Sequence, residues 1–272
     1  MPTFHFGTNL KMHQTPAQTR QYVQAVKAGL SEVEGVHQCQ VWVIPPFTSL
    51  EVAAEEATDS PLVIGAQNIH WADEGAYTGE VSAGMVKACG ARFVMLGHAE
   101  RRTLFGETDE QVNRKVLTAL RHKLGVMLCV GEPRAAYEAG AGHAYVAYQL
   151  QMALQGVSHP GDLWVLYEPV WSVGEGGMPA DSRYVSEGFE NIRKVLIRRF
   201  GREGELVPLL YGGSVDELNC MDYAAIPASS GMGVGRAGLR PHRFVSIFRT
   251  AYRAWQAVQR NESYIEVERP CA

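Results

Sequence analysis

Eight short apolar runs, separated by longer stretches with helical periodicity, constrain the fold of this chain more than any other feature. The runs cover residues 4–6, 41–44, 62–66, 93–96, 126–130, 163–167, 207–211 and 232–234, the last of which is weak. Because most of them are continuously apolar rather than alternating, they predict strands that are covered on both faces. Strands that alternate with helices in this way predict βαβ units and a parallel sheet.

The helical stretches fit the same architecture. Helices are expected from Pro16, from Asp109 to His122, and near the C-terminus, where apolar residues from Phe244 to Val258 fall on one face. Eight βα units in about 260 residues predict a single-domain α/β structure, a closed (βα)8 TIM barrel. We expect this barrel to cover residues 1–260 and a polar surface tail to cover residues 261–272. A doubly wound open sheet is the alternative.

Composition and charge exclude several classes of protein. The net charge is −4, from 25 basic and 29 acidic residues, so no nucleic-acid partner is indicated. The five cysteines lie far apart and form no CxxC pair, which favours a reducing compartment. The apolar runs are too short to span a membrane, and residues 1–11 do not have the pattern of a secretory signal. We therefore expect a cytoplasmic protein with no membrane partner.

Polar residues that directly follow the apolar runs are the candidates for chemistry, because the active site of a parallel barrel lies at the C-terminal ends of its strands. They are Asn9, Lys11, His98, Glu100 and Glu168. Glu168 is the most informative, since a carboxylate in apolar surroundings is costly unless it is paired or used, and burial strengthens it as a base. From the pattern alone, a solvated carboxylate, a structural histidine and a solvent-facing lysine remain open alternatives.

Glycine clusters after the last two runs indicate an anion site. Residues 212–214 (GGS) and 233–235 (GVG) expose backbone N–H groups that suit a phosphate, although tight turns also require glycine. Residues 233–238 also match the dinucleotide pattern GxGxxG. The preceding strand is poor, however, Pro241 follows almost at once, and no second nucleotide-binding half remains. The histidines and cysteines show no metal-binding spacing.

At these positions the chain resembles the triosephosphate isomerase family. The matching stretches are NLKM at 9–12, GAYTGE at 75–80, LGHAERR at 96–102, YEPVW at 167–171 and LYGGSV at 210–215. The resemblance implies a cofactor-independent aldose–ketose isomerase of glycolysis and gluconeogenesis. Such an enzyme interconverts glyceraldehyde 3-phosphate and dihydroxyacetone phosphate through an enediolate.

The resemblance also implies roles for individual residues. The catalytic residues would be Lys11, which stabilises the enediolate, His98, which polarises the carbonyl, and Glu168, the base. Residues 169–180 would form a lid, and no metal or other cofactor is needed. Thr78 would lie on a loop that reaches the site of a partner subunit, which implies a homodimer. The substrate-binding residues would be Asn9, Gly174, Ser214, Gly235 and Arg236.

Several positions depart from the family pattern. Ala99 replaces a usual Ser, Leu10 replaces a usual Trp, and the lid tip and the loop after the last strand also differ. The lid, the Gly235-Arg236 pair and residues 70–75 look like a branch that acts on L-erythrulose 1-phosphate, a four-carbon ketose phosphate. Three alternatives to a triose isomerase therefore stay open. They are the four-carbon isomerase, a non-catalytic sugar-phosphate-binding barrel, and an oxidoreductase suggested only by residues 233–238.

Overall fold

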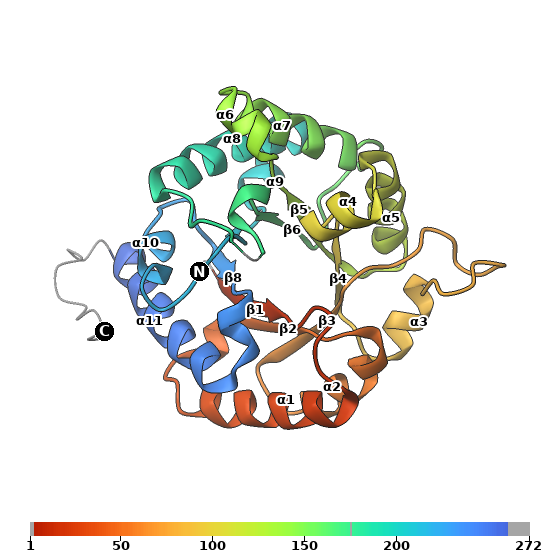
Figure 1. Cartoon of the computed structure of the whole chain (residues 1–272), viewed down its shortest axis with the longest axis vertical. Coiled ribbons are helices and arrows are strands. Elements are labelled where there is room, and N and C mark those ends of the chain that lie inside the picture. Colours follow the sequence, from red (N-terminus) through yellow and green to blue (C-terminus); the bar gives the residue numbers. More distant parts are fainter. Residues whose placement is uncertain (1–2, 175, 261–272) are drawn as a thin grey trace.

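Eight parallel strands close into a barrel in which each strand pairs with its neighbours in chain order (Figure 1). The computed structural model describes residues 3–174 and 176–260. The barrel closes where β1 pairs with β8. This confirms the predicted (βα)8 TIM barrel and excludes the open sheet. The strands are β1 (Phe4–Asn9), β2 (Cys39–Ile44), β3 (Leu62–Ala66), β4 (Phe93–Leu96), β5 (Gly125–Val130), β6 (Leu163–Tyr167), β7 (Leu209–Tyr211) and β8 (Gly231–Gly233).

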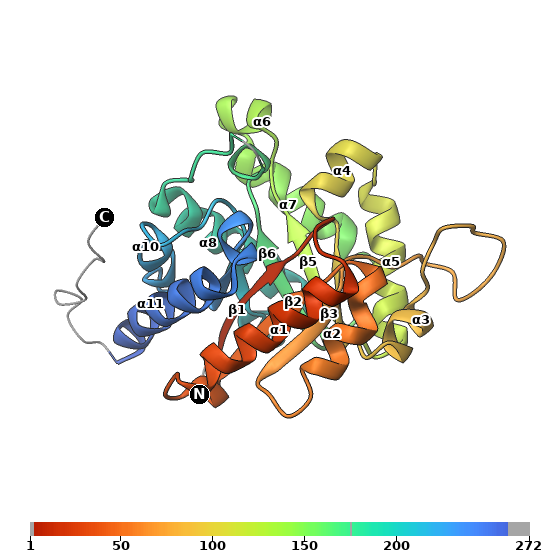
Figure 2. The same ribbon diagram turned by 60° about the horizontal axis from the view of Figure 1, so that its bottom comes forward.

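Helices form a ring around the strands (Figures 1 and 2). The first begins where the sequence predicts, because Thr15 and Gln18 form a capping box and Pro16 suits the first turn. The helices are α1 (Pro16–Ser31), α2 (Leu50–Glu56), α3 (Ala83–Ala88), α4 (Ala99–Phe105), α5 (Asp109–Arg121), α6 (Arg134–Glu138), α7 (Gly142–Ala153), α8 (Ser182–Phe200), α9 (Arg202–Glu205), α10 (Cys220–Ala224) and α11 (Pro241–Gln259).

The strands bury side chains on both faces. The outward face packs against the helices in one large apolar cluster, and the inward face fills the barrel with a second, smaller cluster. Trp42 belongs to the inner cluster and lies against Gly7, where an added Cβ would come within 2.1 Å of the indole ring. The barrel is therefore a packed interior that supports a site at one end.

Five strands differ from their expected limits. β2 and β5 begin one or two residues earlier, at Cys39 and Gly125. β1 continues beyond residue 6 because its ladder with β2 runs as far as the Asn9–Ile44 pair, which places Asn9 at the strand end. β7 begins at Leu209, after Pro208, which has no N–H to donate. β8 covers Gly231–Gly233, one residue earlier than expected, and pairs with both β1 and β7.

Three further expectations concern the dinucleotide pattern, the C-terminal tail and membrane-spanning segments. Residues 233–238 run from the end of β8 into η4 (Arg236–Leu239), a short 3-10 helix, and so do not form the strand–turn–α-helix unit of a dinucleotide site. The predicted tail at residues 261–272 lies outside the described residues. None of the helices in the described part of the chain combines the length and apolar character that a membrane span requires.

Candidate active site

One cavity of about 340 Å³ opens at the C-terminal ends of the strands. All of the residues predicted to be catalytic or substrate-binding line it, although they are far apart in the sequence. Those residues are Asn9, Lys11, His98, Glu168, Gly174, Ser214, Gly235 and Arg236. The cavity is also lined by Trp42, Met95 and Leu166, which belong to the inner core of the barrel.

Glu168 directly follows β6, and only 2% of the residue is exposed. Its Oε1 accepts a hydrogen bond from the backbone N–H of Ala99 at 2.7 Å, and its Oε2 lies 3.5 Å from Nε2 of His98. Burial raises the pKa of the Glu168 carboxyl, and the nearby His98 and the Ala99 N–H oppose that rise. The result is a buried carboxylate with increased proton affinity, as a general base requires.

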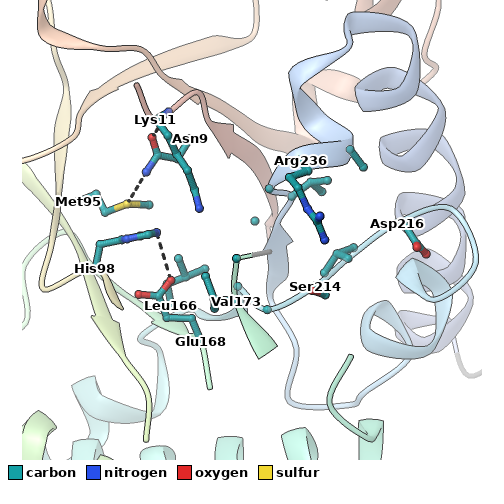
Figure 3. Close-up of a pocket in the computed structure, with 18 of the residues that line it drawn as sticks. Asn9, Lys11, Met95, His98, Leu166, Glu168, Val173, Ser214, Asp216 and Arg236 are labelled. Atoms are coloured by element: carbon teal, nitrogen blue, oxygen red, sulfur yellow. Dashed lines mark hydrogen bonds and ion pairs between the residues drawn. The ribbon is translucent and has the colours of Figure 1, made fainter. Parts of the chain in front are cut away.

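His98 caps the N-terminus of α4 and is 7% exposed. Its Nδ1 accepts the backbone N–H of Glu100 at 3.2 Å, so the proton of the neutral ring is on Nε2. Nε2 faces Glu168 and the cavity, where it can donate to an oxygen of a ligand (Figure 3).

Lys11 has a left-handed backbone with φ +52°, which costs an L-residue about 1–2 kcal/mol. Its N–H donates to Asn9 Oδ1 at 2.8 Å, and its carbonyl accepts from Gln67 Nε2 at 2.8 Å. The same Gln67 amide donates to Asn9 Oδ1 at 3.1 Å. The Lys11 ammonium donates to Glu100 Oε1 at 2.5 Å. These contacts hold the lysine with its charged end at the cavity.

Gln67 was missed by the sequence analysis, which did not consider polar residues after β3. Gln67 directly follows β3, and Asn9 is the last residue of β1, so the same strand-end criterion could have found Gln67. Its two hydrogen bonds to Asn9 and Lys11 make it a positioning residue for the cavity.

The opposite side of the cavity suits an anion. Arg236 extends towards the cavity from the loop after β8 and forms no ion pair with a described residue (Figure 3). By contrast, Lys11 pairs with Glu100, and Arg243 donates two hydrogen bonds of 2.7 and 2.6 Å to Glu217. Arg236 therefore offers a positive charge that no described carboxylate pairs with at this wall, which Asp216 also lines. Gly174, Ser214 and Gly235 complete the same end of the cavity.

The predicted lid, residues 169–180, is anchored near both ends. Near its start, the indole N–H of Trp171 donates to Glu132 Oε1 at 2.9 Å, and Glu132 is fully buried. At its end, the Ala180 carbonyl accepts from the Tyr223 hydroxyl at 2.7 Å. Within the described part of the tip, Gly174 has φ +86°, a conformation that favours glycine. The lid therefore has fixed ends and a glycine-rich tip.

Thr78 does not lie at the cavity of its own chain. It is exposed on the long loop between β3 and α3, which projects from the barrel (Figures 1 and 2). The loop has internal structure, since the ring of His70 packs on Trp71 and on Tyr77 with centroid distances of 4.2 Å each. Residues 3–174 and 176–260 contain no cluster of three or more His, Cys, Asp or Glu that could hold a metal ion.

A closed (βα)8 barrel with a buried carboxylate, a neutral imidazole and a lysine around one cavity is the architecture of a barrel isomerase. A family model described as Triosephosphate isomerase matches residues 5–251 of this chain. The chain therefore belongs to the triosephosphate isomerase family, and the protein is an isomerase.

Individual relatives agree with this assignment. A triosephosphate isomerase from Synechococcus sp. (strain JA-2-3B'a(2-13)) is 41% identical over 242 residues, covering 88% of this chain and 93% of the relative. An L-erythrulose-1-phosphate isomerase from Brucella abortus biovar 1 (strain 9-941) is 38% identical over 254 residues, covering 91% and 96%. The crystal structure of triosephosphate isomerase from Bartonella henselae superposes with a TM-score of 0.83 at 32% identity, covering 93% of this chain and 100% of that one.

Proposed function

We propose that this protein interconverts glyceraldehyde 3-phosphate and dihydroxyacetone phosphate through an enediolate, without a cofactor. The observation that carries the proposal is the convergence of Lys11, His98 and Glu168 on one cavity, with the Glu168 carboxylate almost fully buried. The family membership and the triosephosphate isomerase relatives support the same reaction.

In the proposed mechanism, Glu168 takes a proton from the carbon next to the substrate carbonyl. His98 donates its Nε2–H to the carbonyl oxygen, and the Lys11 ammonium stabilises the negative charge that develops there. The carboxyl group of Glu168 then returns the proton to the neighbouring carbon. The hydroxyl on the carbon that lost its proton becomes the new carbonyl, and its O–H proton passes to His98, which gave its own proton to the former carbonyl oxygen. One C–H bond and one O–H bond break and one of each forms, so the substrate is neither oxidised nor reduced overall and no external electron acceptor is required.

The anion end of the cavity would hold the phosphate. Gly174, Ser214 and Gly235 bring backbone groups close to it, and Arg236 supplies positive charge. Closure of the lid over residues 169–180 would exclude water and protect the enediolate from losing phosphate. The side-chain hydroxyl of Ser214 already joins this wall to the lid, since it donates to the Ser172 carbonyl at 2.8 Å.

The functional form in this proposal is a cytoplasmic homodimer. The projecting loop that carries Thr78 would lie against a second copy of the chain. Two exposed apolar side chains support an interface between two copies of the chain. Tyr77, on the projecting loop, is 47% exposed, and Met12, after β1, is 95% exposed. The scattered cysteines of the sequence support the cytoplasmic location.

The second candidate is an L-erythrulose-1-phosphate isomerase, which performs the same proton transfer on a four-carbon ketose phosphate. The 38% identical Brucella relative favours it, and the Gly235-Arg236 pair of the sequence resembles that branch. A cavity of about 340 Å³ has room for one further carbon and one further oxygen. A non-catalytic sugar-phosphate-binding barrel is disfavoured, because Lys11, His98 and Glu168 are all present and brought together.

Steady-state kinetics on both substrates, with solvent deuterium as a tracer, test this proposal. We expect turnover of glyceraldehyde 3-phosphate and incorporation of deuterium at the reacting carbon, because the proton passes through Glu168. A kcat/KM that is higher for L-erythrulose 1-phosphate would assign the four-carbon reaction instead. Binding of both sugar phosphates without turnover or deuterium exchange would leave only the binding barrel.

A further inference from the structure

The two candidate substrates differ at one place only, and this inference rests on the proposed function. Both have a phosphate on a CH2 group, and in both a proton moves between the next two carbons. The four-carbon ketose has a hydroxymethyl group on the second of these carbons, where dihydroxyacetone phosphate has a hydrogen. Discrimination between them must therefore occur at the end of the cavity that is remote from the phosphate.

Met95 lies at that remote end. Figure 3 shows Arg236 and Ser214 on one side of the cavity and Met95 on the other, next to His98 and Asn9. Met95 belongs to β4, is 2% exposed and joins the inner core of the barrel to the cavity lining.

The side chain of Met95 also contacts a polar group of the site. Its Sδ accepts a hydrogen bond from Asn9 Nδ2 at 3.4 Å. The other end of that amide is fixed, because Asn9 Oδ1 accepts from the Lys11 N–H and from Gln67 Nε2. Thioether sulfur is a weak acceptor, so the Asn9 amide is held by strong partners at its oxygen and by a weak partner at its nitrogen.

We propose that Met95 is the specificity-determining residue for the substituent on the distal reacting carbon. Its volume sets the space available to that substituent. A hydroxyl in this space is a better acceptor than the thioether and can take over the Asn9 Nδ2–H. Methionine is flexible and fills irregular gaps, so the same side chain can close against a hydrogen or move aside for a hydroxymethyl group.

The test compares kcat/KM for L-erythrulose 1-phosphate with kcat/KM for glyceraldehyde 3-phosphate in three variants. Met95→Ala enlarges the remote end, and we expect the four-carbon to three-carbon ratio to rise about tenfold or more, the usual scale for a small group in a fitted pocket. Met95→Leu keeps the volume, so its ratio should stay within a few-fold of wild type. Met95→Val, with an intermediate volume, should give an intermediate rise and serves if Met95→Ala does not fold.

Met127→Ala is the matched control. Met127 is the register partner of Met95 on β5, is fully buried in the same inner core and does not line the cavity. The Met127→Ala variant should lose stability as Met95→Ala does, but its four-carbon to three-carbon ratio of kcat/KM should equal that of wild type. At the phosphate end, Arg236→Gln should lower kcat/KM for both substrates by similar factors.

The outcomes separate this inference from the proposed function. If wild type converts neither substrate, the proposed function fails and the inference falls with it. If wild type is active but Met95→Ala and Met95→Val change the ratio no more than Met127→Ala does, the isomerase assignment stands and the role of Met95 is overturned. An Arg236→Gln variant that changes the ratio instead would move the discrimination to the phosphate end.

Discussion

The Glu168 carboxylate is the group on which the proposed chemistry depends, and its neighbours explain its state. Burial favours its protonated form, while the Ala99 N–H and the nearby His98 favour its charged form. We expect Glu168→Gln to lower kcat by about 10²–10⁴-fold, the usual loss for a general base. Binding of a phosphate-bearing ligand should change little, because the amide oxygen can still accept from Ala99.

Kinetics and ligand titration by calorimetry would check this prediction. Glu51→Gln, an exposed carboxylate in the first turn of α2, is the control for loss of one negative charge. A kcat for Glu168→Gln within a few-fold of wild type would refute the assignment of this residue as the base.

Gly174 tests the lid at the scale of one residue. Its φ is +86° and an added Cβ would meet no atom within 4 Å, so a side chain there is disfavoured by backbone conformation and not by collision. We expect Gly174→Val to weaken phosphate binding and slow turnover, because the strain of about 1–2 kcal/mol moves the loop away from its present path. Glu175→Gln should have little effect on either, although Glu175 lies outside the described residues.

Gly140→Val is the matched control for Gly174→Val. Gly140 has φ +70°, also with open space around an added Cβ, and lies between α6 and α7 outside the cavity. Isothermal titration with inorganic phosphate and steady-state kinetics should separate the two variants. Equal effects of both substitutions on phosphate binding would contradict a local role of Gly174 at the phosphate end of the cavity.

Sequence reasoning named polar residues that the structure brings to one cavity, but it missed Gln67 and the cavity-lining residues that look like core. Asn9, Lys11, His98 and Glu168 interrupt or follow apolar runs, so their position at strand ends was visible in the sequence. Met95 lies within an apolar run, and nothing in the pattern distinguishes a side chain that lines a cavity from one that fills the core. Only the closed barrel shows that its thioether meets the amide of Asn9.

At the scale of strands and helices, the long apolar runs predicted their elements accurately. β3, β4 and β6 have the expected limits, because their side chains are apolar and buried on both faces. β8 was weak in the sequence because two of its three residues are glycine. That strand depends on pairing with β1 and β7, which are distant in sequence, so its exact limits could not be predicted locally.

The contact between β1 and β2 depends on the smallest residue at Gly7. An added Cβ would lie 2.1 Å from Cδ2 of Trp42, closer than any real contact. We expect Gly7→Ala to lower the free energy of unfolding by about 1–3 kcal/mol or more, the range for overpacking in a core. The added Cβ would also lie 2.2 Å from the backbone oxygen of Trp42. In a Trp42→Val background the same change should cost less but still destabilise, because the indole ring is removed while that backbone oxygen stays.

Urea unfolding of the four proteins in this double-mutant cycle would measure the coupling. Gly235→Ala is a control, since an added Cβ at Gly235 would meet no atom within 4 Å. Equal costs of Gly7→Ala in the two backgrounds would show that the indole ring contributes nothing and that the backbone oxygen of residue 42 causes the loss.

The stability of the whole molecule should depend on pH through His5. His5 is 4% exposed, and the centroid of its ring lies 5.0 Å from that of Trp164. Burial lowers the pKa of His5 from 6.5 to about 4. His5 of the unfolded chain binds a proton more readily than His5 of the folded protein. The free energy of unfolding is therefore unaffected by this residue above pH 6.5 and decreases as the pH falls towards 4. A shift of this size corresponds to about 3 kcal/mol at most.

Chemical unfolding at pH values from 7 to 4 would reveal this dependence. His5→Gln cannot titrate, so its stability should fall less steeply over that interval, whatever its stability at neutral pH. His37→Gln, at an exposed position in η1 (Val36–Gln38), should keep the slope of wild type. Identical slopes for His5→Gln and wild type would assign the acid sensitivity to other groups.

The loop between β3 and α3 links the proposed dimer to the active site. At its base, Gln67 holds the Lys11 carbonyl and the Asn9 side chain, and further along it Thr78 is exposed. The packing of Tyr77 on His70 gives the loop a defined shape before any partner binds, which lowers the cost of association. A partner that fixes this loop would therefore also fix the strained backbone of Lys11.

We expect Thr78→Arg to dissociate the dimer, because a long charged side chain would have to be buried in the interface. Sedimentation velocity should show a dimer for wild type and monomers for the variant at micromolar concentration. Specific activity should fall with the loss of dimer, mainly through kcat, because Lys11 loses the support of Gln67 while the phosphate end keeps its own contacts. Glu187→Arg, a charge reversal on the exposed face of α8, is the control and should remain dimeric. A wild-type protein that sediments as a fully active monomer would refute both the dimer and the coupling of this loop to Lys11.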